Sequence, residues 1–134
     1  MKNLSKFYIA GEWVNPISDN MMPVLNPATE EQIGTVALGN TADLDNAVAA
    51  AKSAFNSFRL TSKADRLGLL NELKRLTEKR FEDLAQAMRI EMGAPITMAR
   101  DAQADAAIGH LQGYIEALET VSYTHLTLPT IKRV

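Results

Sequence analysis

The sequence predicts an α/β fold in which short strands come first and helices follow. Apolar residues alternate with polar ones at several places within the first 38 positions, which is typical of strands. From position 44 onward they recur every three or four positions, which is typical of amphipathic helices. Clusters of turn-forming residues at 15–20 and 26–29 separate the strand-like segments. We therefore expect a strand-forming beginning followed by a helical stretch.

The first strands form a hairpin over residues 7–14, because apolar residues flank a turn that contains Gly11, and glycine tolerates positive φ. A brief extended piece follows at Val24 and Leu25. Residues 26–29 predict a turn, since Pro27 fixes φ and Asn26 can bond its own backbone. A further strand is expected over 33–38.

The first helix begins near Thr41, which is a plausible N-cap, and Asp43 and Asp45 lie in its first turn, where the positive helix end favours carboxylates. One stripe of this helix carries large apolar residues, and smaller ones lie beside it. We expect that side to face a core. The stripe consists of Leu44, Val48, Ala51 and Phe55, with Ala47, Ala54 and Phe58 beside it.

The second helical stretch begins at Ser62, which forms a capping box with Asp65. It is one long helix or two joined near Thr77. It ends at about Met92, because Gly93 fits a left-handed cap and a following proline cannot continue the same helix. Its apolar positions are Leu70, Leu73, Thr77, Phe81, Leu84 and Met88.

The last helix begins near Ile96, with Pro95 suited to its first turn. Gly109 and Gly113 on this helix indicate close packing against a neighbour. The helical pattern stops after Thr120, so we divide the chain into 1–120, a partial domain, and 121–134, an anomalous tail. The core side of the helix is Ile108, Leu111, Ile115 and Leu118.

Composition excludes several classes of function. The 134 residues are 46% hydrophobic and 22% charged with a net charge of −2, which is typical of one soluble globular domain or a part of one. This acidic balance argues against nucleic acid as a partner. No apolar run approaches the ~18 residues of a membrane span, and no apolar leader precedes Phe7, so we expect a cytoplasmic protein with no membrane partner. One cluster of cationic residues is interleaved with acidic ones at helical spacing, which predicts an ion-paired surface. The cations are Lys74, Arg75, Lys79 and Arg80, and the acids are Glu72, Glu78, Glu82 and Asp83.

Four segments now resemble a known family in their order and spacing. They are Phe7-Tyr8-Ile9-Ala10-Gly11-Glu12-Trp13, Asn26-Pro27-Ala28-Thr29, Ile33-Gly34-Thr35-Val36 and the alanine-rich helix that ends in Phe55. Glu91-Met92-Gly93-Ala94-Pro95 resembles the same family's Glu-x-Gly-Lys-Pro helix stop, with alanine in place of the usual lysine. The chain is similar to the N-terminal segment of NAD(P)+-dependent aldehyde dehydrogenases. The resemblance implies an incomplete part of a Rossmann-like, cofactor-binding α/β domain.

In that family a cysteine attacks the aldehyde, hydride passes to NAD or NADP, and a glutamate activates the water that releases the acid. This sequence has no cysteine and lacks the family's later motifs. We therefore assign no catalytic, no cofactor-binding and no metal residue. The resemblance implies a fragment that is inactive and binds no cofactor, from a homo-oligomeric parent that oxidises a small-molecule aldehyde. The alternative is a standalone helical binding or interaction module.

The remaining polar candidates are weak. Some relatives hold a monovalent cation near the positions of Val24 and Leu25, with an acidic side chain at the position of Gln103. Because Gln103 is not acidic, the site is doubtful here. The nearby Asp101 and Asp105 are expected to be solvated.

His110 lacks a partner in the pattern and is expected to be structural or exposed. The pairs Glu30-Glu31 and Glu82-Asp83 are expected to be surface charges. The tail, which includes His125, resembles a translated sequencing adapter.

Overall fold

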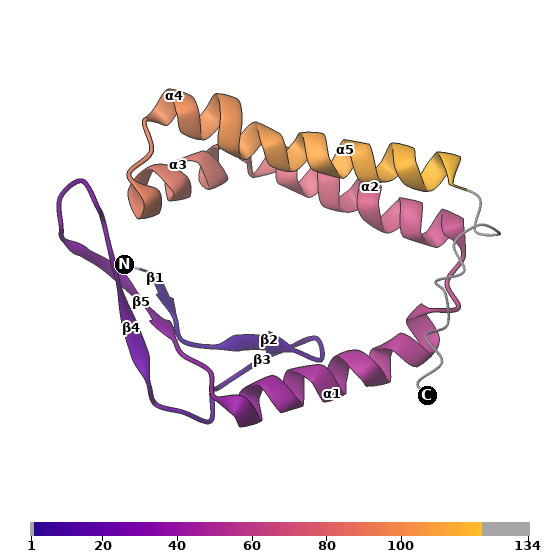
Figure 1. The fold of residues 1–134 in the computed structure, drawn as a ribbon, viewed down its shortest axis with the longest axis horizontal. Helices are drawn as coiled ribbons and strands as arrows, with labels where there is room; N and C mark the ends of the chain where they lie inside the picture. The colour runs from indigo at the N-terminus through magenta and orange to yellow at the C-terminus, as the bar shows by residue number, and fades with distance from the viewer. Residues whose placement is uncertain (1, 122–134) are drawn as a thin grey trace, which may run out of the picture.

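The computed structural model describes residues 2–121, and in this part of the chain strands precede helices as predicted (Figure 1). The fold is α/β. Of the predicted tail, 121–134, residues 122–134, with His125, lie outside the described residues. The elements are β1 (Lys2–Leu4), β2 (Phe7–Ile9), β3 (Glu12–Val14), β4 (Met21–Leu25), β5 (Gln32–Ala37), α1 (Thr41–Phe58), α2 (Lys63–Lys79), α3 (Phe81–Met92), α4 (Ile96–Met98), the π-helix η1 (Ala99–Ala104) and α5 (Asp105–Thr120).

β5 is the centre of a three-stranded sheet of order β1-β5-β4. β1 runs parallel to β5 and β4 runs antiparallel to it, with an irregularity between Val24 and Leu25. Pro23 lies in β4, an edge strand, where a missing N–H is tolerated. The sequence predicted β5 and the end of β4. It missed β1, because this three-residue strand carries no alternation of its own and depends on β5.

The hairpin of β2 and β3 is confirmed. Ala10 and Gly11 both have positive φ, at 55° and 85°, which matches the two-residue turn that favours strand twist. Tyr8 lies opposite Trp13 in the register, and their ring centroids are 5.3 Å apart. Both rings remain largely exposed, so the pair stabilises the hairpin without joining a core.

The N-cap of α1 lies one residue before the predicted one. Asn40, not Thr41, is the N-cap: its side chain accepts from the Asp43 backbone N–H at 3.1 Å, and the Asp43 carboxylate accepts from the Asn40 N–H at 3.0 Å. Thr41 is the first residue of the helix. Asparagine and threonine both cap helices. Asn40 is the cap here because Asp43, three positions later, completes a capping box with it.

The long helical stretch is two helices, α2 and α3, which meet at Arg80, three residues beyond the predicted joint. The capping box of Ser62 and Asp65 is confirmed. Gly93 is also confirmed as a left-handed cap, with φ of 69°. A Cβ built on Gly93 would lie 2.7 Å from Cγ of Pro27, so the end of α3 touches the turn after β4. Glycine is needed there for two reasons, its φ and its size.

The last helix is continuous from Ile96 to Thr120 but includes the π-helical segment η1. Pro95 stands just before the helix as its N-cap instead of in the first turn. The predicted core side is confirmed, with Ile115 buried and the others partly buried where α5 packs along α2. The expected close packing at Gly109 and Gly113 is wrong, because both are exposed and no described atom lies within 4 Å of either Cβ position.

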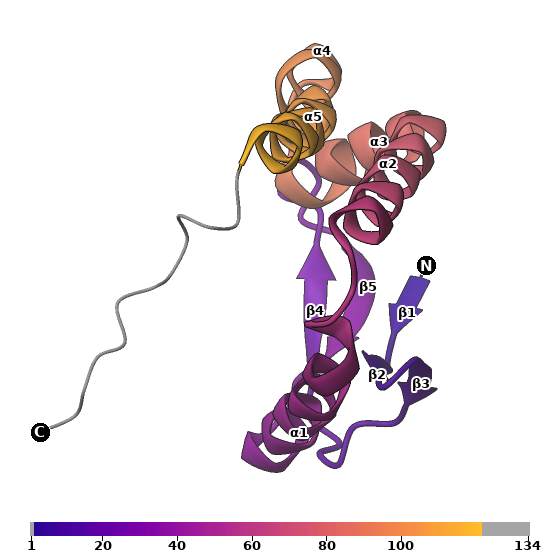
Figure 2. The ribbon, with the colours of Figure 1, turned by 90° about the vertical axis from the view of Figure 1, so that its right-hand side faces the viewer.

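The core of the described residues is small. Its fully buried members are Ala85, Ala99 and Ala104, where α3 meets η1, and no larger side chain is fully buried. The helices α2 and α5 lie side by side, whereas the strands and α1 lie apart from them, so that the ribbon forms an open arc (Figures 1 and 2). The molecule has two layers with little packing between them.

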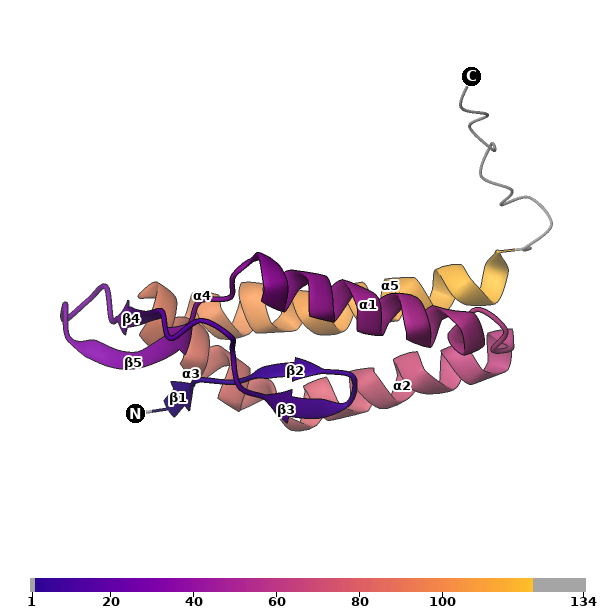
Figure 3. The same cartoon turned by 90° about the horizontal axis from the view of Figure 1, so that it is seen from below.

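The apolar stripe of α1 is exposed, contrary to the sequence prediction. Leu44 and Phe55 are 62% and 61% exposed, and Val48 is 42% exposed. The hairpin contacts α1 through β2 and runs alongside the helix (Figure 3). It meets the alanine side of α1, including Ala47 and Ala54, because small side chains allow the closer approach. Periodicity located the apolar side correctly but could not show that this chain leaves it uncovered.

Candidate functional site

One depression of the described surface lies between the hairpin and the start of α1. It has a volume of about 830 Å³ and is lined by residues that include Phe7, Tyr8, Asn40, Asp43 and Leu44. Its one buried charged side chain is Asp43, at 7% exposure. The two carboxylate oxygens accept from the backbone N–H groups of Asn40 at 3.0 Å and of Ile17 at 2.9 Å. Asp43 therefore fastens the loop after β3 to the helix, and each of its oxygens accepts a backbone N–H.

The most strongly perturbed acid is Glu82 on α3. Its carboxylate accepts two hydrogen bonds from the Arg100 guanidinium, at 2.7 and 2.9 Å, and one from Gln86 at 2.7 Å. The Arg100 bonds and then the Gln86 bond lower the pKa of Glu82 to about 2. Glu82 is thus charged at neutral pH and ties α3 to η1. The sequence missed this pair, since the two residues are 18 positions apart and Arg100 follows a helix stop.

The other charged clusters form the ion-paired surface that the sequence predicted. Arg75 pairs with Glu72 at 2.7 Å, and the pKa of Glu72 is lowered by the hydrogen bonds from that guanidinium. Lys74 pairs with Glu78 at 3.5 Å. The remaining predicted carboxylates, Glu30, Glu31 and Asp83, are exposed, as expected.

His110 is exposed on α5, and within residues 2–121 no carboxylate or hydroxyl pairs with it. The described stretch also contains no group of three or more histidine, cysteine or acidic side chains that could hold a metal ion. Asp101 and Asp105 are exposed, in agreement with the prediction. None of these residues is brought together into a catalytic cluster.

The doubtful cation position remains unsupported. Val24 and Leu25 lie in β4 and Gln103 lies in η1. Oε1 of Gln103 is buried without a hydrogen-bond partner in the described part of the chain, but an amide supplies no negative charge. We assign no cation to it.

Three of the helix N-termini carry negative charge. A dinucleotide pyrophosphate binds where backbone N–H groups are free and no carboxylate competes. The first turns of α1 and α2 carry the capping carboxylates Asp43 and Asp65, and α3 begins with Glu82 and Asp83. The helix that begins at Ile96 has no acid in its first turn and no side-chain cap. We assign no ligand to any of these N-termini.

No helix among residues 2–121 is both long and apolar enough to cross a membrane.

Comparison with known proteins decides the family. The family model described as "Aldehyde dehydrogenase family" matches residues 13–133. The chain belongs to the aldehyde dehydrogenase family. A curated Staphylococcus aureus relative is 40% identical over 123 residues, which are 92% of this chain and 26% of that protein. The chain thus spans about a quarter of the length of the curated relatives it matches, in agreement with the predicted incomplete domain.

Solved aldehyde dehydrogenases have the same fold over this stretch. The Bartonella henselae enzyme is 40% identical with a TM-score of 0.90, and the match covers 92% of this chain and 26% of that one. Aldehyde dehydrogenase C of Pseudomonas syringae, solved as a cysteine-to-alanine mutant with NAD+ and octanal, is 42% identical with a TM-score of 0.87, over 90% of this chain and 25% of that one. The predicted family is confirmed.

Proposed function

We propose that residues 1–120 are the N-terminal, scaffold-forming part of an oxidoreductase that converts an aldehyde to a carboxylic acid with NAD+. One observation carries the proposal: the chain matches an aldehyde dehydrogenase at a TM-score of 0.90 while covering 26% of it, and this quarter contains no cysteine. The chemistry therefore belongs to residues outside the matched quarter. The chain alone is inactive under this proposal.

NAD+ is proposed in preference to NADP+ because the Pseudomonas syringae structure and one from Mycobacterium tuberculosis, 26% identical with a TM-score of 0.85, were solved with NAD+. The match to the latter covers 90% of this chain and 26% of that one. The octanal in the former supports an aliphatic aldehyde as one substrate class. We further propose a Rossmann-like cofactor domain, a homo-oligomer and a cytoplasmic location for the longer protein. The standalone module is disfavoured, because the relatives continue for about three times the length matched here.

A chimera tests this function. Residues 1–120 of this chain replace the matching quarter of the Staphylococcus aureus relative, and NADH formation from octanal and NAD+ is followed at 340 nm. We expect the chimera to retain activity within about tenfold of the unmodified relative, because the quarter supplies scaffold and no reacting group. A soluble, folded chimera without activity would contradict the proposal.

The isolated chain provides a second test. Titration of the 134-residue polypeptide with NAD+ should give no saturable heat signal, since carboxylates occupy the first turns of α1, α2 and α3 and would repel a diphosphate. The whole relative, which supplies the missing residues, serves as the positive control. Saturable binding to the isolated chain at millimolar NAD+ would place a cofactor site in this quarter and refute the assignment.

A further inference from the structure

Large apolar side chains gather on one side of α1 and on the adjacent hairpin, and nothing among residues 2–121 covers them. Leu44, Val48 and Phe55 lie within roughly 40° of one another around the helix, at 100° per residue. On the hairpin, Tyr8 and Trp13 are 63% and 64% exposed. We name these five side chains the α1–hairpin face.

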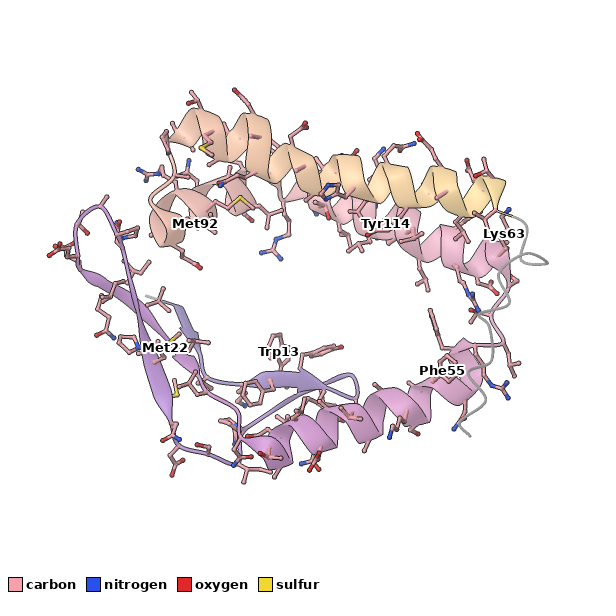
Figure 4. All side chains as sticks on the ribbon, viewed as in Figure 1. Trp13, Met22, Phe55, Lys63, Met92 and Tyr114 are labelled. Carbon is pink, nitrogen blue, oxygen red and sulfur yellow. The ribbon has the colours of Figure 1, made fainter. Side chains whose placement is uncertain are left out.

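The five side chains of the face carry no charge, although Lys6 and Asp43 line the depression beside Tyr8 and Leu44. The alanine side of α1 contacts the hairpin, which brings Tyr8 next to the helix, and the larger stripe begins beside that contact. In Figure 4, Trp13 and Phe55 both lie on the inner side of the arc, facing the layer of α2 and α5. No described side chain of that layer reaches them to form a core cluster. An uncharged surface of this kind costs free energy in water and favours burial against another apolar surface.

The open arrangement is that of a much longer protein. The backbone superposes on the Bartonella henselae enzyme at a TM-score of 0.90 although three-quarters of that enzyme lies outside the match. A chain that had folded to bury its own tryptophan and phenylalanines would close the arc and lose this agreement. The arc therefore has a shape that suits additional polypeptide.

We propose that the α1–hairpin face is a docking surface that recognises the remaining three-quarters of an aldehyde dehydrogenase chain, also when that remainder is a separate polypeptide. The proposal rests on the proposed function only for the identity of the partner. The recognition is mainly apolar, because the five side chains of the face carry no charge.

Co-expression tests the docking. The Staphylococcus aureus relative without its matched quarter carries an affinity tag, and its soluble yield is measured with and without the 134-residue chain. We expect the 134-residue chain to raise the soluble yield of the tagged remainder and to co-purify with it in a 1:1 molar ratio. Val48→Asp should lower the co-purified amount by roughly tenfold or more, since a charge would enter an apolar interface.

Ser53→Asp is the matched control, because position 53 lies on the side of α1 opposite Val48 and is exposed. It should co-purify as the unchanged chain does. Circular dichroism of both variants should show equal helix content, and Val48→Thr should give an intermediate yield. Equal binding of Val48→Asp and Ser53→Asp, or no gain in soluble yield with the unchanged chain, would overturn the proposal.

The activity of the co-purified complex separates the two proposals. A complex that forms through Val48 but makes no NADH supports the docking and counts against the function. An active covalent chimera combined with no association in trans supports the function and overturns the docking. A discrete dimer of the isolated chain that Val48→Asp dissociates, without binding of the remainder, would assign the face to a second copy and overturn the proposal.

Discussion

Among the described glycines, Gly93 is the one that is both left-handed and in close contact with another side chain. Its φ of 69° is left-handed, and an added Cβ would meet Pro27 at 2.7 Å. We predict that Gly93→Ala destabilises the chain by roughly 1–3 kcal/mol, because a left-handed alanine alone costs about 1–2 kcal/mol. The measurement is the urea midpoint of helix loss by circular dichroism.

Gly113→Ala is the control for Gly93. This glycine is exposed inside α5, and apart from the backbone of its own helix no atom of residues 2–121 lies within 4 Å of its Cβ position. Alanine should leave the midpoint unchanged or raise it, by up to about 1 kcal/mol. Equal loss in both variants would show that Gly93 is not a special position.

The carboxylate of Glu82 makes the folded chain less stable as the pH falls. Its pKa falls from 4.5 in the unfolded chain to about 2 when folded, because Arg100 and Gln86 donate to the charged form. A lowered folded pKa means that the contribution is present above pH 4.5 and is lost as the pH falls toward 2. We predict that Arg100→Gln weakens the pH dependence of helix loss between pH 4.5 and 2. Carboxyl NMR titration should then place Glu82 closer to its ordinary pKa; an unchanged titration would contradict the pairing.

Local signals made some residues predictable. Ser62, Asp65 and Gly93 were found from the sequence because their partners lie within a few positions. Asn40 was missed by one residue because Thr41 caps helices as well. The pairing of Arg100 could not be predicted, since its partner Glu82 lies on another helix.

At the scale of elements, Asp43 links two segments. Its carboxylate both closes the capping box of α1 and accepts from Ile17 after β3. We predict that Asp43→Ala costs about 1–3 kcal/mol, because two backbone donors lose their partner near a buried position. The measurement is again the urea midpoint.

Asp45→Ala tests whether that loss comes from the bonds or from negative charge near the start of the helix. Asp45 is exposed and lies just beyond the first turn of α1, which has Asp43 as its acid, so the predicted place of Asp45 in the first turn is wrong. Its removal should change the stability by at most about 0.5 kcal/mol. A loss equal to that of Asp43→Ala would assign the effect to charge alone.

Periodicity predicted most elements because each contains its own pattern. β5 and all the long helices came from spacing, and the Asn26–Thr29 turn came from its residue types. β1 could not be predicted, since its three residues are ordered by pairing with β5. The π-helix η1 was also missed, because its extra residue per turn leaves no mark in an alanine-rich sequence.

For the whole molecule, the sequence could predict the family and the absence of a thiol, but it could not predict the open arc. That shape depends on which apolar surfaces are buried against another part of the protein. The apolar stripe of α1 has the same sequence pattern whether the segment that covers it belongs to this chain or to another. The described residues bury few large side chains, so the helices are held mainly by the pairings of α2 with α5 and α3 with η1. We expect such a chain to be loosely packed when alone.

Calorimetry of the purified 134-residue chain, together with binding of an apolar fluorescent dye, tests this central claim most directly. We predict strong dye binding and a broad transition whose enthalpy is well below the ordinary value of about 0.7 kcal/mol per residue, because the α1–hairpin face lacks its partner. A sharp, cooperative transition of ordinary enthalpy without dye binding would show a self-sufficient domain and would contradict the account.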